Sequence, residues 1–183
     1  MRRRAIWRGL AIGAVLSACV IAALVLFGGN EEEPATLGAI PTASGQTGDP
    51  APSEPFERFD GTEATFADYL GTPLVVNFFA SWCAPCVREM PAFEAVHQEM
   101  GDQVAFLGMN NQDRASDGEA IAEKTGVTYD LSRDPDGDFL SAFGGIVMPT
   151  TVFIDAEGTV VEVHNGALSE SALEDRLHDL FGT

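Results

Sequence analysis

Apolar residues in this chain gather in two patterns, short continuous runs and stretches with helical spacing. Residues 74–80 form a nearly unbroken apolar run, which predicts a strand buried on both faces. Residues 84–100 follow with a helical pattern in which Cys86, Met90 and Phe93 share one face. A buried strand that leads directly into an amphipathic helix is therefore expected at the centre of the fold.

Further elements are predicted on either side of this unit. In chain order they are an edge strand and turn at 56–61, a helical turn at 65–70 ended by Gly71, a strand at 104–109, a helix capped by Ser116 or Asp117 that runs to Glu123, a turn at 134–137 with a short helix to Phe143, a hairpin of strands 150–154 and 159–163, and a final helix capped by Ser169. This alternation indicates an α/β domain in which helices cover both faces of a central sheet.

The N-terminal residues follow a different pattern. Four arginines within the first eight residues precede residues 9–29, a 21-residue stretch without a charge, and three glutamates follow at 31–33. A stretch of this length can cross a bilayer. Basic residues before it and acidic residues after it are typical of an N-terminus that stays in the cytoplasm. We predict a signal anchor over residues 1–29.

Cys19 leaves a second way of attachment open. Residues 16–19, Leu-Ser-Ala-Cys, match the bacterial lipobox, so a lipidated Cys19 could replace the membrane span. Two features favour the anchor: residues 20–27 stay apolar beyond the cysteine, and the apolar run before it is short for a signal peptide. In both cases the domain is tethered outside the cytoplasm.

Residues 30–55 are rich in Pro, Gly, Thr, Ala and Ser, and contain little that could be buried. This composition predicts a flexible linker. The folded domain is accordingly expected over residues 56–183.

The charge balance excludes one class of partner. The chain has 28 acidic and 10 basic residues, and four of the basic ones lie in the N-terminal arginine cluster. A domain this acidic is not expected to bind nucleic acid or an anionic membrane surface. Its charge could attract basic substrates, or could reflect a salt-rich habitat.

The chemistry is indicated by Cys83 and Cys86, which are separated by two residues at the start of the predicted helix. Backbone N–H groups and the positive end of the helix dipole favour a thiolate there. One helical turn separates the two cysteines, close enough for a disulfide. A zinc site would need a second pair of ligands, which the remaining cysteine and three histidines do not provide, so no metal is expected. A purely structural disulfide remains an alternative.

The sequence Trp82-Cys83-Ala84-Pro85-Cys86 resembles the W-C-x-P-C signature of the thioredoxin superfamily. Its context is similar to the membrane-anchored TlpA/ResA/CcmG branch, and the resemblance covers residues 56–183. It implies a thioredoxin fold with a central mixed sheet, and thiol–disulfide exchange outside the cytoplasm, often in cytochrome c maturation. The predicted order of elements agrees with that fold.

The two cysteines are expected to have different roles. Cys83 lies before the first helical turn and is predicted to be the exposed nucleophile, whereas Cys86 lies on the buried face and resolves the mixed disulfide. The resemblance implies that Trp82 contacts substrate and that Ala84 and Pro85 tune the redox potential.

Met148 and Pro149 resemble the family's cis-proline segment, which packs against the disulfide and pairs with the substrate backbone. The family usually has glycine two residues before this proline, whereas this chain has Val147. The resemblance therefore predicts a cis peptide bond and substrate binding at Met148 and Pro149, with a groove of altered shape.

Glu89 is the most informative polar residue of the helix. It falls close to Cys86 on the helical wheel and is expected to be at least partly buried, which raises the pKa of a carboxyl group. Thioredoxins have a buried aspartate on the preceding strand where this chain has Asn77, and Glu89 matches the functional glutamate of the ResA-like branch. We predict that Glu89 transfers protons. The alternative is an acid that merely stabilises the first helical turn.

Together these features predict an extracytoplasmic, single-pass membrane oxidoreductase that needs no cofactor. The predicted activity is the reduction of protein disulfides, with apocytochrome c as a possible substrate and a transmembrane thiol carrier as electron donor, both implied by the resemblance alone. The alternatives are an oxidase that forms disulfides in exported proteins and a non-catalytic binding or chaperone module.

Overall fold

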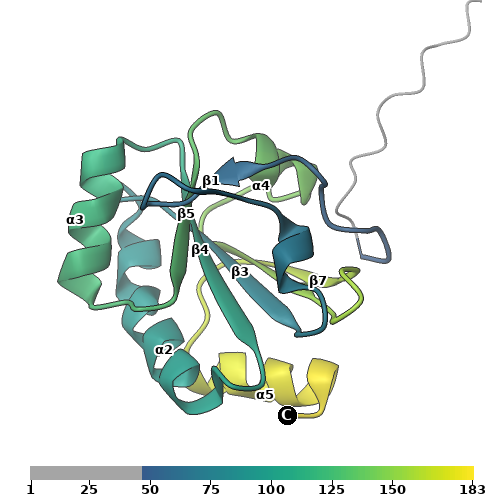
Figure 1. The fold of residues 1–183 in the computed structure, drawn as a ribbon. Helices are drawn as coiled ribbons and strands as arrows, with labels where there is room; N and C mark the ends of the chain where they lie inside the picture. The colour runs from purple at the N-terminus through teal and green to yellow at the C-terminus, as the bar shows by residue number, and fades with distance from the viewer. Residues whose placement is uncertain (1–46) are drawn as a thin grey trace, which may run out of the picture. The chain divides into compact units, whose positions relative to one another are not determined.

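The computed structural model of the protein describes residues 47–183, and a five-stranded sheet lies at the centre of this region (Figure 1). The strands run in the order β5-β4-β3-β6-β7 and are β3 (Leu74–Phe79), β4 (Ala105–Asn111), β5 (Asp130–Asp134), β6 (Thr150–Ile154) and β7 (Val160–Asn165). Strands β3, β4 and β5 are parallel, whereas β6 is antiparallel to both of its neighbours. The mixed sheet and the thioredoxin fold are confirmed.

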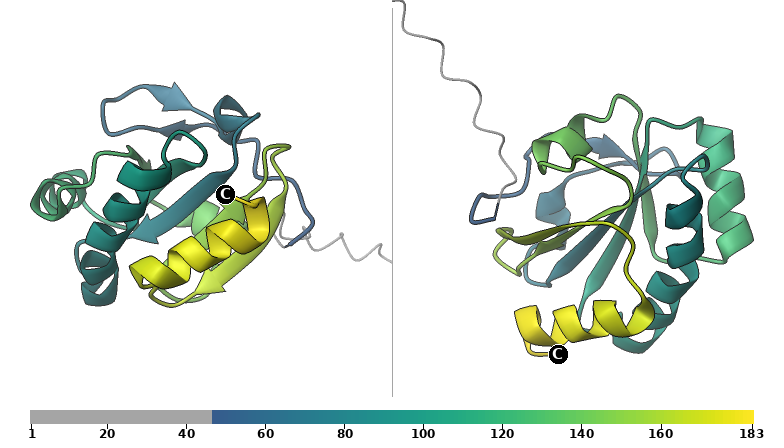
Figure 2. Two further views of the ribbon diagram at one scale, coloured as in Figure 1. Left: turned by 90° about the horizontal axis from the view of Figure 1, so that it is seen from below. Right: turned by 180° about the vertical axis from the view of Figure 1, so that it is seen from behind.

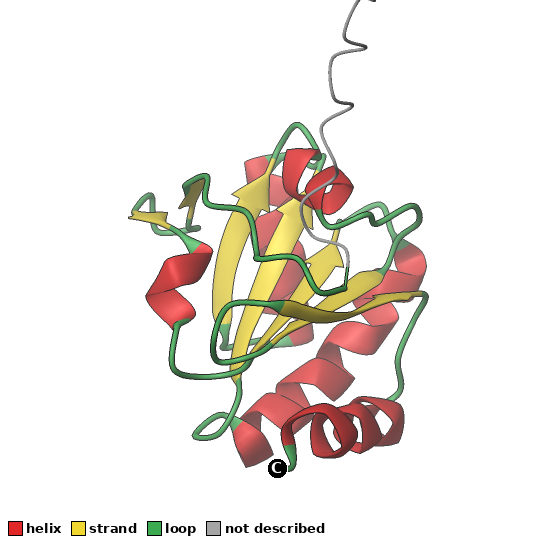
Figure 3. Ribbon diagram, turned by 90° about the vertical axis from the view of Figure 1, so that its right-hand side faces the viewer, coloured by secondary structure: helices red, strands yellow, loops and turns green. Residues whose placement is uncertain are grey.

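Helices cover both faces of the sheet (Figure 3). One face carries α2 (Ala84–Met100) and α5 (Glu170–Phe181), which lie side by side in Figure 2, and α3 (Ala115–Thr125) packs against α2. The other face carries α4 (Asp138–Ala142), the 3₁₀ helix η1 (Phe66–Tyr69) and a small hairpin of β1 (Phe56–Glu57) and β2 (Glu63–Ala64).

The central strand β3 is buried on both faces, as its apolar run predicts. Val75 points into a core formed with α2 and α5, while Val76 and Phe78 point into a core with aromatic residues of β1, η1 and α4. Each fully buried side chain of this size contributes roughly 1.5–3 kcal/mol. These two cores hold the C-terminal end of β3, from which the cysteine motif follows, at a fixed place.

Some predicted boundaries differ from the structure. Strand β5 was not expected, and β4 continues past Met109 to Asn111. Helix α3 begins at Ala115 with Arg114 as its N-cap, earlier than the predicted caps Ser116 and Asp117, because the amide of Asp117 already donates to the carbonyl of Arg114.

The folded domain also begins before Phe56, within the range predicted as a linker. The amide of Gly48 donates to the carbonyl of Val160, and the amide of Val160 donates to that of Asp49, with distances of 2.8 and 2.9 Å. Ala51 in turn donates to Gly158 at 2.9 Å. This segment therefore lies along the β6–β7 hairpin.

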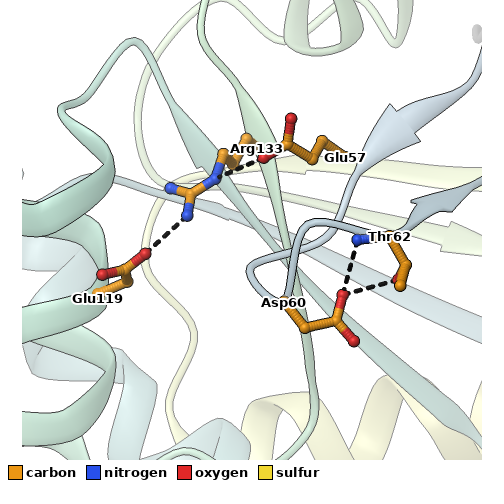
Figure 4. Close-up of polar contacts among 5 residues, drawn as sticks. All are labelled: Glu57, Asp60, Thr62, Glu119 and Arg133. Carbon is orange, nitrogen blue, oxygen red and sulfur yellow. Dashed lines mark hydrogen bonds and ion pairs between the residues drawn. The ribbon is translucent and has the colours of Figure 1, made fainter.

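Arg133 of β5 fastens the small hairpin to the main sheet (Figure 4). Its guanidinium contacts Glu57 of β1 at 3.5 Å and Glu119 of α3 at 2.7 Å, and lies 4.5 Å from the centroid of the Phe59 ring. The hairpin turn is closed by Asp60, whose carboxylate accepts hydrogen bonds from the amide and hydroxyl of Thr62.

The predicted anchor over residues 1–29, the possible lipidation site Cys19 and residues 30–46 of the linker lie outside the described residues. Among residues 47–183, no helix has the length and apolar character needed to cross a membrane.

Candidate active site

The turn that follows β3 presents the first cysteine. The amide of Cys83 donates to the carbonyl of Ala80 at 3.1 Å, which closes a tight turn, and Cys83 is the N-cap of α2. Its Sγ atom accepts a hydrogen bond from the backbone N–H of Cys86 at 3.3 Å. A sulfur held against free N–H groups at a helix N-terminus is stabilised as a thiolate, because the helix dipole favours negative charge there.

Cys83 and Cys86 form a disulfide, with their Cα atoms 5.3 Å apart. The exposed fraction of Cys83 is 5%, whereas Cys86 is completely buried. Cys83 is thus the less buried of the two residues, but it is not the exposed side chain that the sequence predicted. Ala84 and Pro85 occupy the first turn of α2, where the missing N–H of proline costs no hydrogen bond.

The segment before β6 lies against the cysteine pair. The Met148–Pro149 peptide bond is cis, as expected, and Met148 packs on the cluster that contains both cysteines. The hydroxyl of Thr150 donates to the carbonyl of Val147 at 2.6 Å and so fixes the preceding turn. Val147 stands where the family usually has glycine, and its side chain is half exposed.

Apolar side chains that face solvent lie in the segments next to the disulfide. Trp82 is 59% exposed, and Ile146 and Val147 are 83% and 50% exposed. Single exposed apolar side chains are normal on a protein surface, so their position beside the disulfide is what makes them candidates for substrate contact. Trp82 and Met148, predicted to bind substrate, thus belong to the two segments that border the disulfide.

Glu89 is buried one helical turn beyond Cys86, with an exposed fraction of 4%. One carboxylate oxygen accepts a hydrogen bond from the side-chain amide of Asn77 at 2.9 Å, and the other accepts one from the backbone N–H of Leu168 at 2.9 Å. Burial raises the pKa of Glu89 to about 7, although both hydrogen bonds act in the opposite direction. A carboxyl group with this pKa can take up or release a proton near neutrality.

A polar group beside the turn was not predicted from the sequence. Asp113 follows β4 and accepts hydrogen bonds from the backbone N–H and the hydroxyl of Ser81, at 2.6 and 2.9 Å. The indole N–H of Trp82 donates to the backbone carbonyl of Gln112, the residue before Asp113, at 3.2 Å. The parallel strands β3, β4 and β5 have their C-terminal ends at the same edge of the sheet. This general property of parallel strands could have indicated that the residues after β4 lie beside the cysteine turn.

These segments also border an open cleft of about 620 Å³ beside the turn. Its lining is mainly polar and includes Trp82, Asp113, Asp117 and Asp136. No cluster of His, Cys, Asp and Glu suited to a metal ion occurs among residues 47–183. The chemistry that the described residues offer is that of a thiol pair with a buried proton acceptor.

Comparison with known proteins agrees with this chemistry. The model of the AhpC/TSA family matches residues 47–163. The thiol-disulfide oxidoreductase ResA of Geobacillus thermodenitrificans is 30% identical over 73% of this chain and 77% of its own length. The thiol:disulfide interchange protein DsbE of Xylella fastidiosa is 32% identical over 75% of this chain and 70% of its own.

Two solved structures of DsbF proteins are also similar to this chain in fold and in sequence. A DsbF homologue from Corynebacterium diphtheriae has a TM-score of 0.67 and is 26% identical, with 73% of this chain and 87% of that chain covered. The structure of MTB DsbF, in mixed oxidised and reduced forms, has a TM-score of 0.66 and is 28% identical, with 71% and 98% covered.

Proposed function

This chain belongs to the AhpC/TSA family, and from that membership and the geometry of its cysteine pair we propose that it reduces disulfides of exported proteins outside the cytoplasm. It is a thiol–disulfide oxidoreductase of the ResA/DsbE type, with Cys83 and Cys86 as its redox pair.

The observation that carries the proposal is the asymmetry of the two cysteines. The Cys83 sulfur is the N-cap acceptor of α2, and Cys83 is the less buried of the two residues. In the reduced protein, the Cys83 thiolate attacks one sulfur of a substrate disulfide and expels the other as a thiolate, which takes up a proton. A mixed disulfide between Cys83 and the substrate results.

Cys86 then completes the reaction. Its thiol loses a proton and the thiolate attacks Cys83 Sγ, which releases the substrate's second thiol and forms the Cys83–Cys86 disulfide. Two electrons pass from the protein to the substrate. A membrane thiol carrier on the same side must reduce the pair again before the next cycle.

Glu89 is proposed as the acceptor of the Cys86 proton. It lies one turn further along α2, is shielded from solvent, and has a pKa raised to about 7. A group with this pKa can accept a proton from a thiol during the attack and return it to solvent afterwards. The exchange would be fastest where Glu89 is ionised and Cys83 is a thiolate.

Location and substrate are proposed from the sequence pattern. The arginine cluster and the uncharged stretch 9–29 support an anchor with the domain outside, and a lipidated Cys19 would leave the domain on the same side. The names of the relatives ResA and DsbE support a protein thiol or disulfide as substrate. Apocytochrome c is proposed from the resemblance of the cysteine motif to the TlpA/ResA/CcmG branch.

A topology experiment tests the location. A reporter enzyme that is active only outside the cytoplasm, fused after Thr183, should be active, and a cytoplasmic reporter at the same site should be inactive. Protease added to intact spheroplasts should degrade the domain. Protection of the domain from protease would contradict an extracytoplasmic site.

A further inference from the structure

The turn that carries Cys83 is held from one side by the loop after β4. Ser81 and Trp82 are the two central residues of the Ala80–Cys83 turn, and each is bound by this loop. Asp113 accepts both the backbone N–H and the hydroxyl of Ser81, and the carbonyl of Gln112 accepts the Trp82 indole N–H. A contact at both central residues restricts how the turn can move.

The Asp113 carboxylate is itself fixed in place. One oxygen accepts from the Ser81 N–H and from the side-chain amide of Asn110 at 3.1 Å, and the other accepts from the Ser81 hydroxyl and the Arg114 N–H at 2.9 Å. Burial alone would raise the pKa of Asp113, but these four hydrogen bonds together hold it below its usual value. The group is therefore an ionised acceptor throughout the neutral range.

We propose that Asp113 is a positioning residue for thiol–disulfide exchange, which holds the Ala80–Cys83 turn so that the Cys83 sulfur faces the N-terminus of α2. This inference rests on the proposed function and deepens it. The favourable environment of the Cys83 thiolate depends on its hydrogen bond from the Cys86 N–H, which in turn depends on the position of the turn. Asp113 acts through Ser81.

Position and charge have opposite effects, which makes the inference testable. If Asp113 acted on Cys83 only through its negative charge, its removal would lower the pKa of the Cys83 thiol and speed exchange. If it acts by holding the turn, its removal weakens the contact between Cys83 Sγ and the helix N-terminus, so the thiol pKa rises and exchange slows.

The test compares Asp113→Ala with Asp117→Ala in the full-length protein in detergent. Asp117 lines the same cleft from the first turn of α3, and within residues 47–183 its carboxylate has no hydrogen bond to the Ala80–Cys83 turn. The pH dependence of alkylation, followed on the Cys83 peptide by mass spectrometry, gives the thiol pKa separately from those of Cys19 and Cys86. Reduction of an aromatic disulfide, followed by stopped flow, gives the exchange rate.

We expect Asp113→Ala to raise the Cys83 pKa by about one and to slow exchange at neutral pH about threefold. Where this pKa lies above the working pH, the thiolate fraction falls about tenfold, but the more basic thiolate is about threefold more nucleophilic. In Asp117→Ala the pKa of the Cys83 thiol should be unchanged or slightly lowered. Asp113→Asn should recover part of the rate, because its oxygen can still accept from the Ser81 N–H while the Ser81 hydroxyl accepts from its amide. The hydrogen bond from the Arg114 N–H is lost in this variant.

Equal pKa values and rates in Asp113→Ala and Asp117→Ala would overturn the inference, and so would a lowered pKa in Asp113→Ala alone. If Asp113→Ala does not fold, Ser81→Ala decides, since it removes only the hydroxyl contact. A smaller change in the same direction supports the role, and no change contradicts it. A wild-type protein that reduces no disulfide would refute the proposed function, while alkylation of Cys83 would still decide the role of Asp113.

Discussion

The side-chain amide of Asn77 on β3 donates a hydrogen bond of 2.9 Å to the Glu89 carboxylate on α2, and both residues are buried. The side-chain oxygen (Oδ1) of Asn77 has no hydrogen-bond partner among the described residues. After rotation of the amide, Asn77 can therefore accept a hydrogen bond from protonated Glu89, as it donates one to the ionised form. The hydrogen bond between Asn77 and Glu89 can therefore be kept in both protonation states of Glu89.

Replacement of Glu89 by Gln tests its part in exchange. The glutamine can accept from the Leu168 N–H and donate to Asn77, so the fold should persist, but it cannot take a proton. We expect exchange at neutral pH to slow by about tenfold or more. The pKa of the Cys83 thiol should fall, because a nearby negative charge is removed.

The matched control is Glu99→Gln, which changes an exposed glutamate on the same helix. It should leave both thiol titration and stopped-flow rates unchanged. If Glu89→Gln also keeps the wild-type rate and only loses a little stability, Glu89 has no part in the chemistry.

Glu89 should also make stability depend on pH. Its pKa is about 7 in the folded protein and near 4.5 in the unfolded chain, so the folded state binds the proton more tightly. The stabilisation is fully present below about pH 4.5 and is lost as pH rises through about 7. This difference between the folded and unfolded pKa corresponds to about 3 kcal/mol in the free energy of unfolding.

Urea unfolding of the oxidised wild type and the Glu89→Gln variant at about pH 4 and about pH 8 measures this effect. The variant should gain stability relative to the wild type as pH rises. A difference between the two proteins that stays the same at both pH values would mean that Glu89 is not buried in a way that raises its pKa.

The roles of the cysteines can be separated by trapping. Cys86→Ser keeps the nucleophile but removes the residue that releases the substrate, so mixed disulfides should accumulate through Cys83. Cys83→Ser should trap no partner through the cysteine pair, because Cys86 is completely buried. Non-reducing electrophoresis and peptide mass spectrometry would identify the linked residue. If the Cys83→Ser variant traps partners instead, the nucleophile is Cys86 and the resolving thiol is Cys83.

Gly118 of α3 is predicted to be essential for the approach of α3 to β4. Alanine in a helix usually improves stability by up to about 1 kcal/mol over glycine. Here a Cβ atom would collide with the side-chain amide of Asn110, which donates to Asp113. We expect Gly118→Ala to lower the free energy of unfolding by about 1–3 kcal/mol. The exposed control Ser116→Ala should be neutral or stabilising in urea unfolding, and a stabilised Gly118→Ala would contradict the prediction.

Much of this fold follows from local patterns. The run before the cysteines reads as a buried strand because both faces of β3 are covered, and the burial of Glu89 follows from helical spacing alone. Strand β5, with the sequence Asp-Leu-Ser-Arg-Asp, has no such signal. It is a strand because it pairs with β4 and because its charged residues have partners in distant elements, as Arg133 has in β1 and α3.

The polar contacts of the site were the hardest to predict. Leu168 meets Glu89 across the core and Asp113 meets Ser81 across the sheet edge, although these pairs are 79 and 32 residues apart in the sequence. A carboxylate on a loop carries no local sign of its partner. Only the topology, in which parallel strands end together, brings Asp113 beside the cysteine turn.

The reduction potential of the Cys83–Cys86 pair tests the central claim most directly. It can be measured by equilibrating the purified protein with glutathione or dithiothreitol buffers and quantifying free thiols by mass spectrometry. A reductase is expected to have a potential near that of thioredoxin, about −270 mV. A potential close to that of a strong oxidant, about −120 mV, would mean that the protein forms disulfides, and would contradict the proposed direction.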